Sequence, residues 1–105
     1  MTDQWVDVCP VSDVGDDYPV SVIVDEKEIA LYRVGDEVFA TDNLCTHGQA
    51  RLCEGYQEGY EIECPLHQGR FDVRSGKALC APLTSDIKVY PVRLVDERIS
   101  IDIKA

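Results

Sequence analysis

Two short segments, each pairing a cysteine with a histidine, constrain the fold of this chain more than any other feature of its sequence. In "CTHGQA" one residue separates Cys45 from His47. In "CPLHQG" two residues separate Cys64 from His67. Thiolates and imidazoles are metal ligands. Each pair follows a plausible strand, and each segment contains a glycine that lets the backbone turn tightly. We therefore expect two strand-ended loops that converge on one metal centre.

Residue types alone leave two kinds of metal centre open. Two cysteines and two histidines would satisfy a tetrahedral zinc ion. Zinc modules usually begin with two ligands that are separated by two to four residues, whereas the first pair here has only one residue between its members. The alternative is a 2Fe–2S cluster with two cysteines on one iron and two histidines on the other, which is the Rieske arrangement. The spacing favours this cluster.

Alternating apolar and polar residues, with turn signals about every eight to twelve residues, predict an all-β domain. Segments 18–25 and 28–34 flank the polar break Glu26–Lys27, which predicts a hairpin. Gly35–Asp36 then separates the second segment from a strand over 37–42. The three strands are expected to form a meander.

A second hairpin is predicted near the end of the sequence, where segments 87–95 and 98–103 flank Asp96–Glu97. Three isoleucines alternate with polar residues in its second strand, so one face of that strand should be buried. Pro91 lacks a donor for a β-ladder and marks the first strand as an edge strand or a bulge.

The middle of the chain, residues 43–84, is irregular and rich in glycine, cysteine, histidine and proline. It contains only short strand-like pieces, over 60–64 and 69–73. A long irregular segment in a compact domain needs a function or an internal tether, and a metal centre would supply both. Arg70 and Asp72 could form a supporting ion pair in this segment.

The chain resembles the small Rieske ferredoxins of bacterial aromatic-ring-hydroxylating dioxygenase systems, and among these the naphthalene-dioxygenase type. The resemblance rests on the Cys/His pattern and on "LYRVGDEVFATDNLCTHGQA", "IECPLHQGRFDVRSGKALCAP" and "YPV". It implies the all-β Rieske fold, with an antiparallel β-sandwich or barrel-like base. It also implies a single domain over residues 1–105, in which a smaller cluster-binding subdomain of two loops, about residues 43–84, is inserted in the base.

The resemblance further implies that Cys45, His47, Cys64 and His67 bind one 2Fe–2S cluster. The imidazole edges would lie at the surface, and residues 80–84 would form a loop that covers the cluster. The implied function is a one-electron carrier without catalytic residues, which passes electrons from an NAD(P)H-dependent flavin reductase to the terminal oxygenase in aromatic hydrocarbon catabolism.

Alternatives to this carrier remain open at the level of the sequence. The chain has two histidines, and because the cluster would use both, none is left for the 2-His-1-carboxylate iron site of the oxygenase itself. The Rieske small subunit of another redox enzyme, such as a nitrite reductase or an oxidase, is the main alternative. A zinc-binding interaction module and a redox sensor are the others.

Ligand charge determines the reduction potential that we expect. Replacing two thiolates by neutral imidazoles brings the oxidised cluster to zero charge, which raises the potential above that of an all-cysteine cluster. High-potential Rieske proteins carry an extra cysteine in each loop, joined by a disulfide, and the residues at those positions here are Ala50 and Leu66. We therefore expect a potential near the low end of the Rieske range.

The other cysteines and the overall charge limit the remaining possibilities. Cys9, Cys53 and Cys80 match no ligand pattern and are expected to be small buried or half-buried residues. The formal net charge of −10 argues against binding nucleic acid or an anionic membrane and favours a basic protein partner. The sequence has no apolar run of the roughly 18–20 residues that cross a bilayer, and no signal-peptide pattern. We therefore expect a cytoplasmic protein.

Overall fold

The computed structural model describes residues 5–46, 50–66, 69–80 and 85–104. Within these ranges the chain is almost entirely β, which confirms the predicted class. The strands are β1 (Trp5–Pro10), β2 (Val20–Val24), β3 (Lys27–Val34), β4 (Glu37–Asp42), β5 (Tyr56–Glu58), β6 (Glu61–Glu63), β7 (Arg70–Asp72), β8 (Val89–Tyr90), β9 (Val92–Val95) and β10 (Arg98–Asp102). Two short 3-10 helices are η1 (Val11–Asp13) and η2 (Leu52–Glu54). Neither these nor any other helix in the described ranges is long and apolar enough to cross a membrane.

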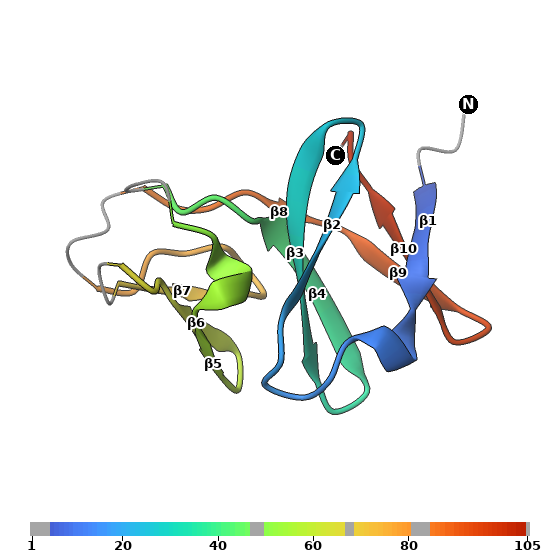
Figure 1. The fold of residues 1–105 in the computed structure, drawn as a ribbon, viewed down its shortest axis with the longest axis horizontal. Helices are drawn as coiled ribbons and strands as arrows, with labels where there is room; N and C mark the ends of the chain where they lie inside the picture. The colour runs from blue at the N-terminus through green and yellow to red at the C-terminus, as the bar shows by residue number, and fades with distance from the viewer. Residues whose placement is uncertain (1–4, 47–49, 67–68, 81–84, 105) are drawn as a thin grey trace.

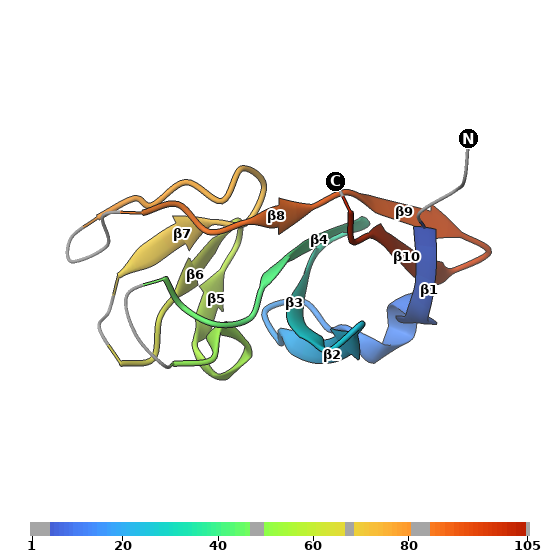
Figure 2. The same cartoon turned by 90° about the horizontal axis from the view of Figure 1, so that it is seen from above.

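Two antiparallel sheets form a base at one end of the molecule (Figures 1 and 2). One has the strand order β2-β3-β4-β8 and the other the order β1-β10-β9. Strands β8 and β9 are consecutive in the chain yet belong to different sheets, with Pro91 between them. Because proline has no N–H to donate to a ladder, it suits the point where the chain leaves one sheet for the other. Both strands lie at sheet edges, as Pro91 predicted.

The third antiparallel sheet, with the order β5-β6-β7, lies beside the base at the other end of the long axis (Figure 1). All three of its strands come from the chain between β4 and β8. Ile62 in its central strand stands opposite Phe71, and neither side chain has any solvent exposure. The small sheet is therefore held by its apolar face against the rest of the molecule.

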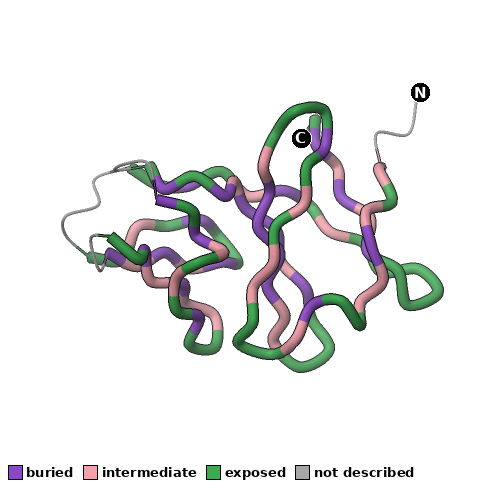
Figure 3. Tube along the Cα trace, in the orientation of Figure 1, coloured by how far each residue is buried: buried purple, intermediate pink, exposed green. Residues whose placement is uncertain are grey.

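Strand β3 separates two hydrophobic cores. Ile29 and Leu31 belong to the core of the base, whereas Ala30 and Tyr32 belong to a second core on the side of the small sheet. None of the four is exposed to solvent, and Figure 3 shows the buried stretch in the middle of the molecule. A strand that is buried on both faces has a continuous apolar sequence rather than an alternating one. This explains the run "IALY".

Both predicted hairpins are present, although in the second only β9, rather than the whole predicted strand over 87–95, pairs with β10. The turn of the first hairpin lies one residue earlier than predicted. Asp25 and Glu26 occupy the turn, while Lys27 is already in β3 and pairs with Val24. Both turn residues have positive φ, 51° and 67°, as in the two-residue turns that match the twist of a hairpin. The polar residues alone did not locate this turn correctly, because Lys27 is polar and exposed although it is the first residue of β3.

Strand β1 is not predicted by the sequence pattern. It pairs with β10, with Trp5 opposite Asp102 and Pro10 opposite Arg98. The register shifts between Asp7 and Cys9, which interrupts the alternation that would reveal a strand. Its partner also lies at the far end of the sequence, so nothing local indicates the pairing.

Candidate metal centre

The two cysteines of the predicted centre each follow a strand. Strand β4 ends at Asp42, shortly before Cys45, and β6 ends at Glu63, directly before Cys64. Both cysteines are buried, with exposed fractions of 5% and 0%, and both belong to the second core. Loops from two different sheets thus bring one thiol each into the same apolar surroundings.

Each of the two loops is closed by a backbone hydrogen bond at the equivalent position. The N–H of Cys45 donates to the carbonyl oxygen of Ala50 at 2.9 Å, and the N–H of Cys64 donates to that of Gly69 at 2.8 Å. In both loops the acceptor lies five residues after the cysteine. Each predicted histidine therefore falls within a segment whose ends are joined through the amide of the cysteine.

The first loop is also held by side chains. Asn43 is fully buried; its Oδ1 accepts the N–H of Cys53 at 2.9 Å, and its Nδ2 donates to the carboxylate of Glu28 at 3.3 Å. Arg51 donates to the same carboxylate through Nε at 2.8 Å. The hydrogen bonds from Arg51 and then Asn43 lower the pKa of Glu28. Since Glu28 lies in β3, these contacts tie the first loop to the base.

The second loop is followed by an arginine with three carboxylate partners. Nη1 of Arg70 donates to Glu58 at 3.1 Å and to Glu61 at 3.2 Å. Nη2 of Arg70 lies 3.0 Å from the carboxylate of Glu63. All four residues belong to strands β5, β6 and β7. These ion pairs therefore tie the start of β7, directly after the second loop, to the small sheet.

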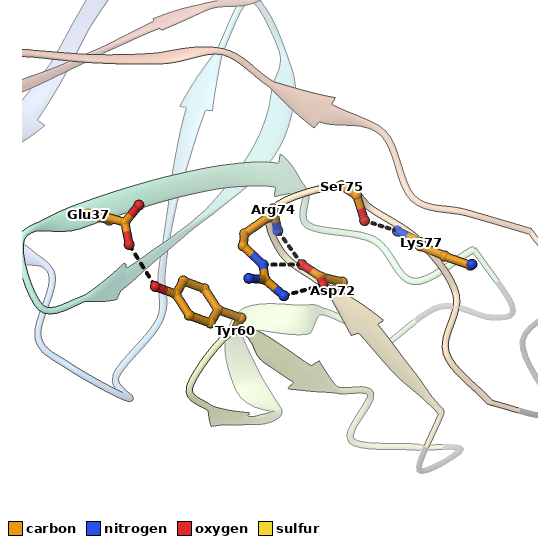
Figure 4. Close-up of polar contacts among 6 residues, drawn as sticks. All are labelled: Glu37, Tyr60, Asp72, Arg74, Ser75 and Lys77. Atoms are coloured by element: carbon orange, nitrogen blue, oxygen red, sulfur yellow. Dashed lines mark hydrogen bonds and ion pairs between the residues drawn. The ribbon is translucent and has the colours of Figure 1, made fainter.

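The predicted ion pair between Arg70 and Asp72 is wrong. Asp72 instead accepts from Nη2 of Arg74 at 2.8 Å and from the backbone N–H of the same residue (Figure 4). The turn after β7 brings Arg74 back over Asp72, whereas Arg70 extends across β6 toward its glutamates. The hydrogen bonds from Arg74 lower the pKa of Asp72.

Tyr60, in the turn between β5 and β6, joins the small sheet to the base. Its hydroxyl donates to the carboxylate of Glu37 in β4 at 2.7 Å (Figure 4). Its ring packs edge-on against Phe39, with the ring centroids 5.7 Å apart, and the Arg74 guanidinium lies 4.1 Å from the same centroid. These contacts hold the two parts of the molecule, and hence the two loops, in one arrangement.

A third segment reaches the first loop. The hydroxyl of Thr46 donates to the carbonyl oxygen of Ser85 at 3.0 Å, across 39 positions of the sequence. Ser85 follows the predicted covering loop, of which residues 81–84 lie outside the described residues. The part of the chain after that loop therefore lies beside the first cysteine loop.

The described residues contain the cysteine half of the predicted ligand set. His47 and His67 lie outside them, as does Gly48. Within the described ranges no group of three or more His, Cys, Asp or Glu side chains is placed to hold a metal ion. Two thiols from matching loops in one buried core nevertheless suit the share of a Rieske site that cysteines supply. The residues present thus fit a 2Fe–2S cluster.

Comparison with known proteins identifies the family. The family model of the Rieske [2Fe-2S] domain matches residues 4–91. The chain belongs to the Rieske [2Fe-2S] domain family. This Rieske domain is 56% identical, over 103 residues, to the ferredoxin component of the naphthalene 1,2-dioxygenase system of Pseudomonas putida, a match that covers 98% of this chain and 99% of the relative. The predicted resemblance is confirmed, and the cofactor is a single Rieske-type 2Fe–2S cluster.

Solved structures agree with this assignment. The Sphingomonas yanoikuyae B1 ferredoxin superposes on the Rieske domain with a TM-score of 0.88 at 47% identity, covering 92% of this chain and 96% of that one. A chain from the complex of reduced oxygenase and oxidized ferredoxin in carbazole 1,9a-dioxygenase has a TM-score of 0.88 at 36% identity, covering 96% and 94%. The predicted Rieske fold is confirmed.

The other three cysteines of the Rieske domain differ in their surroundings. Cys9 is buried in the core of the base, where burial raises the pKa of its thiol. Cys53 is half-buried, as expected. Cys80 is exposed, so the expectation of a buried residue is wrong there. Cys80 lies two residues after Ala78, which forms an isolated β-bridge with Phe71. Among the described residues, no strand is assigned between that bridge and β8.

Proposed function

We propose that this chain is the ferredoxin component of an aromatic-ring-hydroxylating dioxygenase system and acts in aromatic hydrocarbon catabolism. It is a one-electron carrier rather than an enzyme. The observation that carries the proposal is the pair of buried cysteines, Cys45 and Cys64, in two loops closed in the same way. Similarity over nearly the whole chain to a dioxygenase ferredoxin component supports it.

We propose that Cys45 and Cys64 bind one iron of the cluster, and that His47 and His67 bind the other. When bound, the cluster accepts one electron and releases it again. The chain's own residues keep both thiols in a core that excludes water and hold the loops by backbone hydrogen bonds. We assign the four ligands to a cluster-binding subdomain, about residues 43–84, within one domain over residues 1–105.

The proposed partners are an NAD(P)H-dependent flavin reductase and a terminal Rieske oxygenase, in the cytoplasm. NAD(P)H gives up two electrons together as a hydride, whereas iron sites accept them singly, so a flavin must divide the pair. The formal charge of −10 suits basic docking surfaces, since attraction raises the association rate without requiring a long-lived complex. A complex of oxygenase and ferredoxin is known in carbazole 1,9a-dioxygenase.

The test is whether the purified protein contains equal amounts of iron and acid-labile sulfide and transfers electrons between these partners. We expect an EPR signal after reduction by dithionite. With a flavin reductase and a naphthalene-type oxygenase, we expect product formation that depends on this chain. Zinc in place of iron would refute the cluster. Tight copurification with a catalytic chain, without transfer to an oxygenase, would favour the small subunit of a nitrite reductase or an oxidase.

The cysteine ligands can be tested one at a time. Serine in place of Cys45 or Cys64 removes a thiolate, and we expect the iron content to fall by about 10-fold or more, as the visible spectrum will show. Cys9→Ala is the matched control, because Cys9 lies in the core of the base, whereas Cys45 and Cys64 lie in the second core. It should keep the iron content of the wild type. A Cys45→Ser protein with full iron would contradict the assignment.

A further inference from the structure

The two cysteine loops have similar backbones but different anchors. In both, an arginine directly follows the residue whose carbonyl accepts the cysteine N–H: Arg51 follows Ala50, and Arg70 follows Gly69. Arg70 pairs only with glutamates of the small sheet among the described residues. Arg51 instead pairs with Glu28 in the base. The first loop therefore depends on a contact between the two parts of the molecule.

Asn43 is the centre of that contact and uses both its backbone and its side chain. Its N–H donates to the carbonyl oxygen of Glu28 at 3.0 Å, and its own carbonyl oxygen accepts the N–H of Leu52 at 2.7 Å. Its side chain accepts from Cys53 and donates to Glu28. Leu52 and Cys53 lie after the first loop, whereas Asn43 lies before it. One buried residue thus joins the two ends of the loop to each other and to β3.

Asparagine suits this position because both halves of its amide are used. The side-chain oxygen must face the N–H of Cys53, since a backbone N–H can only donate, and this leaves the side-chain nitrogen for the carboxylate of Glu28. Aspartate has nearly the same shape but has no donor, and it would bring a second carboxylate against Glu28. A leucine would leave the N–H of Cys53 without its acceptor.

We propose that Asn43 is a positioning residue for the cluster: its amide, oriented by Glu28, holds the first cysteine loop in the geometry that the ligands need. This inference rests on the proposed assignment of Cys45 and His47 as ligands. Asn43 itself does not bind the cluster. It acts through the loop, so its loss should change how firmly the cluster is held and the symmetry around it, and not only the stability of the fold.

The test compares Asn43→Asp with Tyr32→Phe. Tyr32 is fully buried in the second core, and its hydroxyl bonds to Thr41 at 3.0 Å, so the control also removes one buried hydrogen bond but none of the hydrogen bonds that Asn43 makes. Three properties are measured. The first is the rate of iron release to an excess of chelator, monitored by visible absorbance. The others are the EPR spectrum after reduction and the thermal unfolding temperature. We expect Asn43→Asp to release iron roughly 10- to 100-fold faster than the wild type and to alter the EPR line shape. Tyr32→Phe should match the wild type in both.

A rescue variant separates positioning from a general loss of stability. In Asn43→Asp combined with Glu28→Gln, the glutamine amide can donate to the new carboxylate, which restores the hydrogen bond with its direction reversed. Iron release should return to within a few-fold of the wild type. If Asn43→Asp does not fold, Glu28→Ala can be used instead. It removes the carboxylate that orients the Asn43 amide, at a partly exposed position, and should also make iron release faster than in the wild type.

Two outcomes would overturn the inference. One is an Asn43→Asp or Glu28→Ala protein with the iron release and EPR spectrum of the wild type. The other is iron release that follows only the unfolding temperature across all variants, Tyr32→Phe included. A wild-type protein without iron and sulfide would overturn the proposed function first, so the two failures are distinguishable.

Discussion

Arg74 interacts with the carboxylate of Asp72 on one side and with the ring of Tyr60 on the other. Its hydrogen bonds hold the pKa of Asp72 below the ordinary value, which is about 4. A carboxyl whose pKa is lower in the folded state contributes stability above the unfolded-state value, and this contribution is lost as the pH falls through the folded-state pKa.

We therefore expect Arg74→Gln to raise the pKa of Asp72, as measured by NMR titration of its carboxyl carbon. The variant should be less stable than the wild type at pH 7 by no more than about 1 kcal/mol, because the pair is partly exposed. The difference should narrow below about pH 4, where the carboxyl becomes protonated. An unchanged titration of Asp72 would contradict this account.

Gly76 and Gly35 both have positive φ but differ in their surroundings. A Cβ on Gly76 would lie 2.0 Å from the carbonyl oxygen of Ile87, whereas one on Gly35 would meet no atom within 4 Å. Alanine at Gly35 should therefore cost only the left-handed backbone, about 1–2 kcal/mol. We expect Gly76→Ala to cost more than twice as much in denaturant unfolding, because it also forces apart two backbone segments joined by a hydrogen bond. Equal losses of stability in the two variants would contradict this expectation, because they would show that the backbone around Gly76 and Ile87 can move apart at little cost.

At the scale of the element, the two hairpin turns hold residues other than glycine in left-handed backbone. Asp25 and Glu26 have φ of 51° and 67°, and Asp96 and Glu97 have φ of 52° and 62°. Such turns favour glycine at the second position. Glycine would remove the strain of left-handed backbone at this position, about 1–2 kcal/mol. This gain exceeds the roughly 0.5–1 kcal/mol that glycine costs through its greater flexibility in the unfolded chain.

We expect Glu26→Gly and Glu97→Gly each to raise the free energy of unfolding by about 0.5–1 kcal/mol, the difference between those two effects. Ser21→Gly, at an exposed position inside β2, is the control and should lower it. Thermal or denaturant unfolding would measure all three. A loss of stability in both turn variants would mean that the turn backbone differs from the one described.

For the molecule as a whole, net charge and loop composition both favour a low reduction potential within the range that the ligands allow. The formal charge of −10 opposes the addition of an electron. Ala50 and Leu66 exclude the disulfide between the loops that high-potential relatives have. We expect a midpoint near the low end of the range of roughly −150 to +300 mV. A redox titration followed by EPR would measure it, and added salt should raise it by screening the surface charge. A strongly positive midpoint would disprove this expectation.

The amino-acid sequence was enough to predict the proposed ligand set of this protein and much of its local structure. Both depend on residue type and short spacing: the cysteine–histidine pairs that begin at Cys45 and Cys64, the hairpins around their polar turns, and the alternation of Ile99 and Ile101 with polar residues. Such features involve neighbours in the chain, so their physical requirements are visible within a few residues.

Which distant groups meet could be learned only from the folded molecule. Arg51 and Arg70 occupy equivalent positions after the two loops, yet one pairs with Glu28 of the base and the other with the glutamates of the small sheet. In the same way β1 pairs with β10, and β3 serves two cores. These contacts join residues far apart in the sequence, and they form because of how whole apolar faces pack. The period of a strand shows that a face is apolar, but it does not show what covers that face.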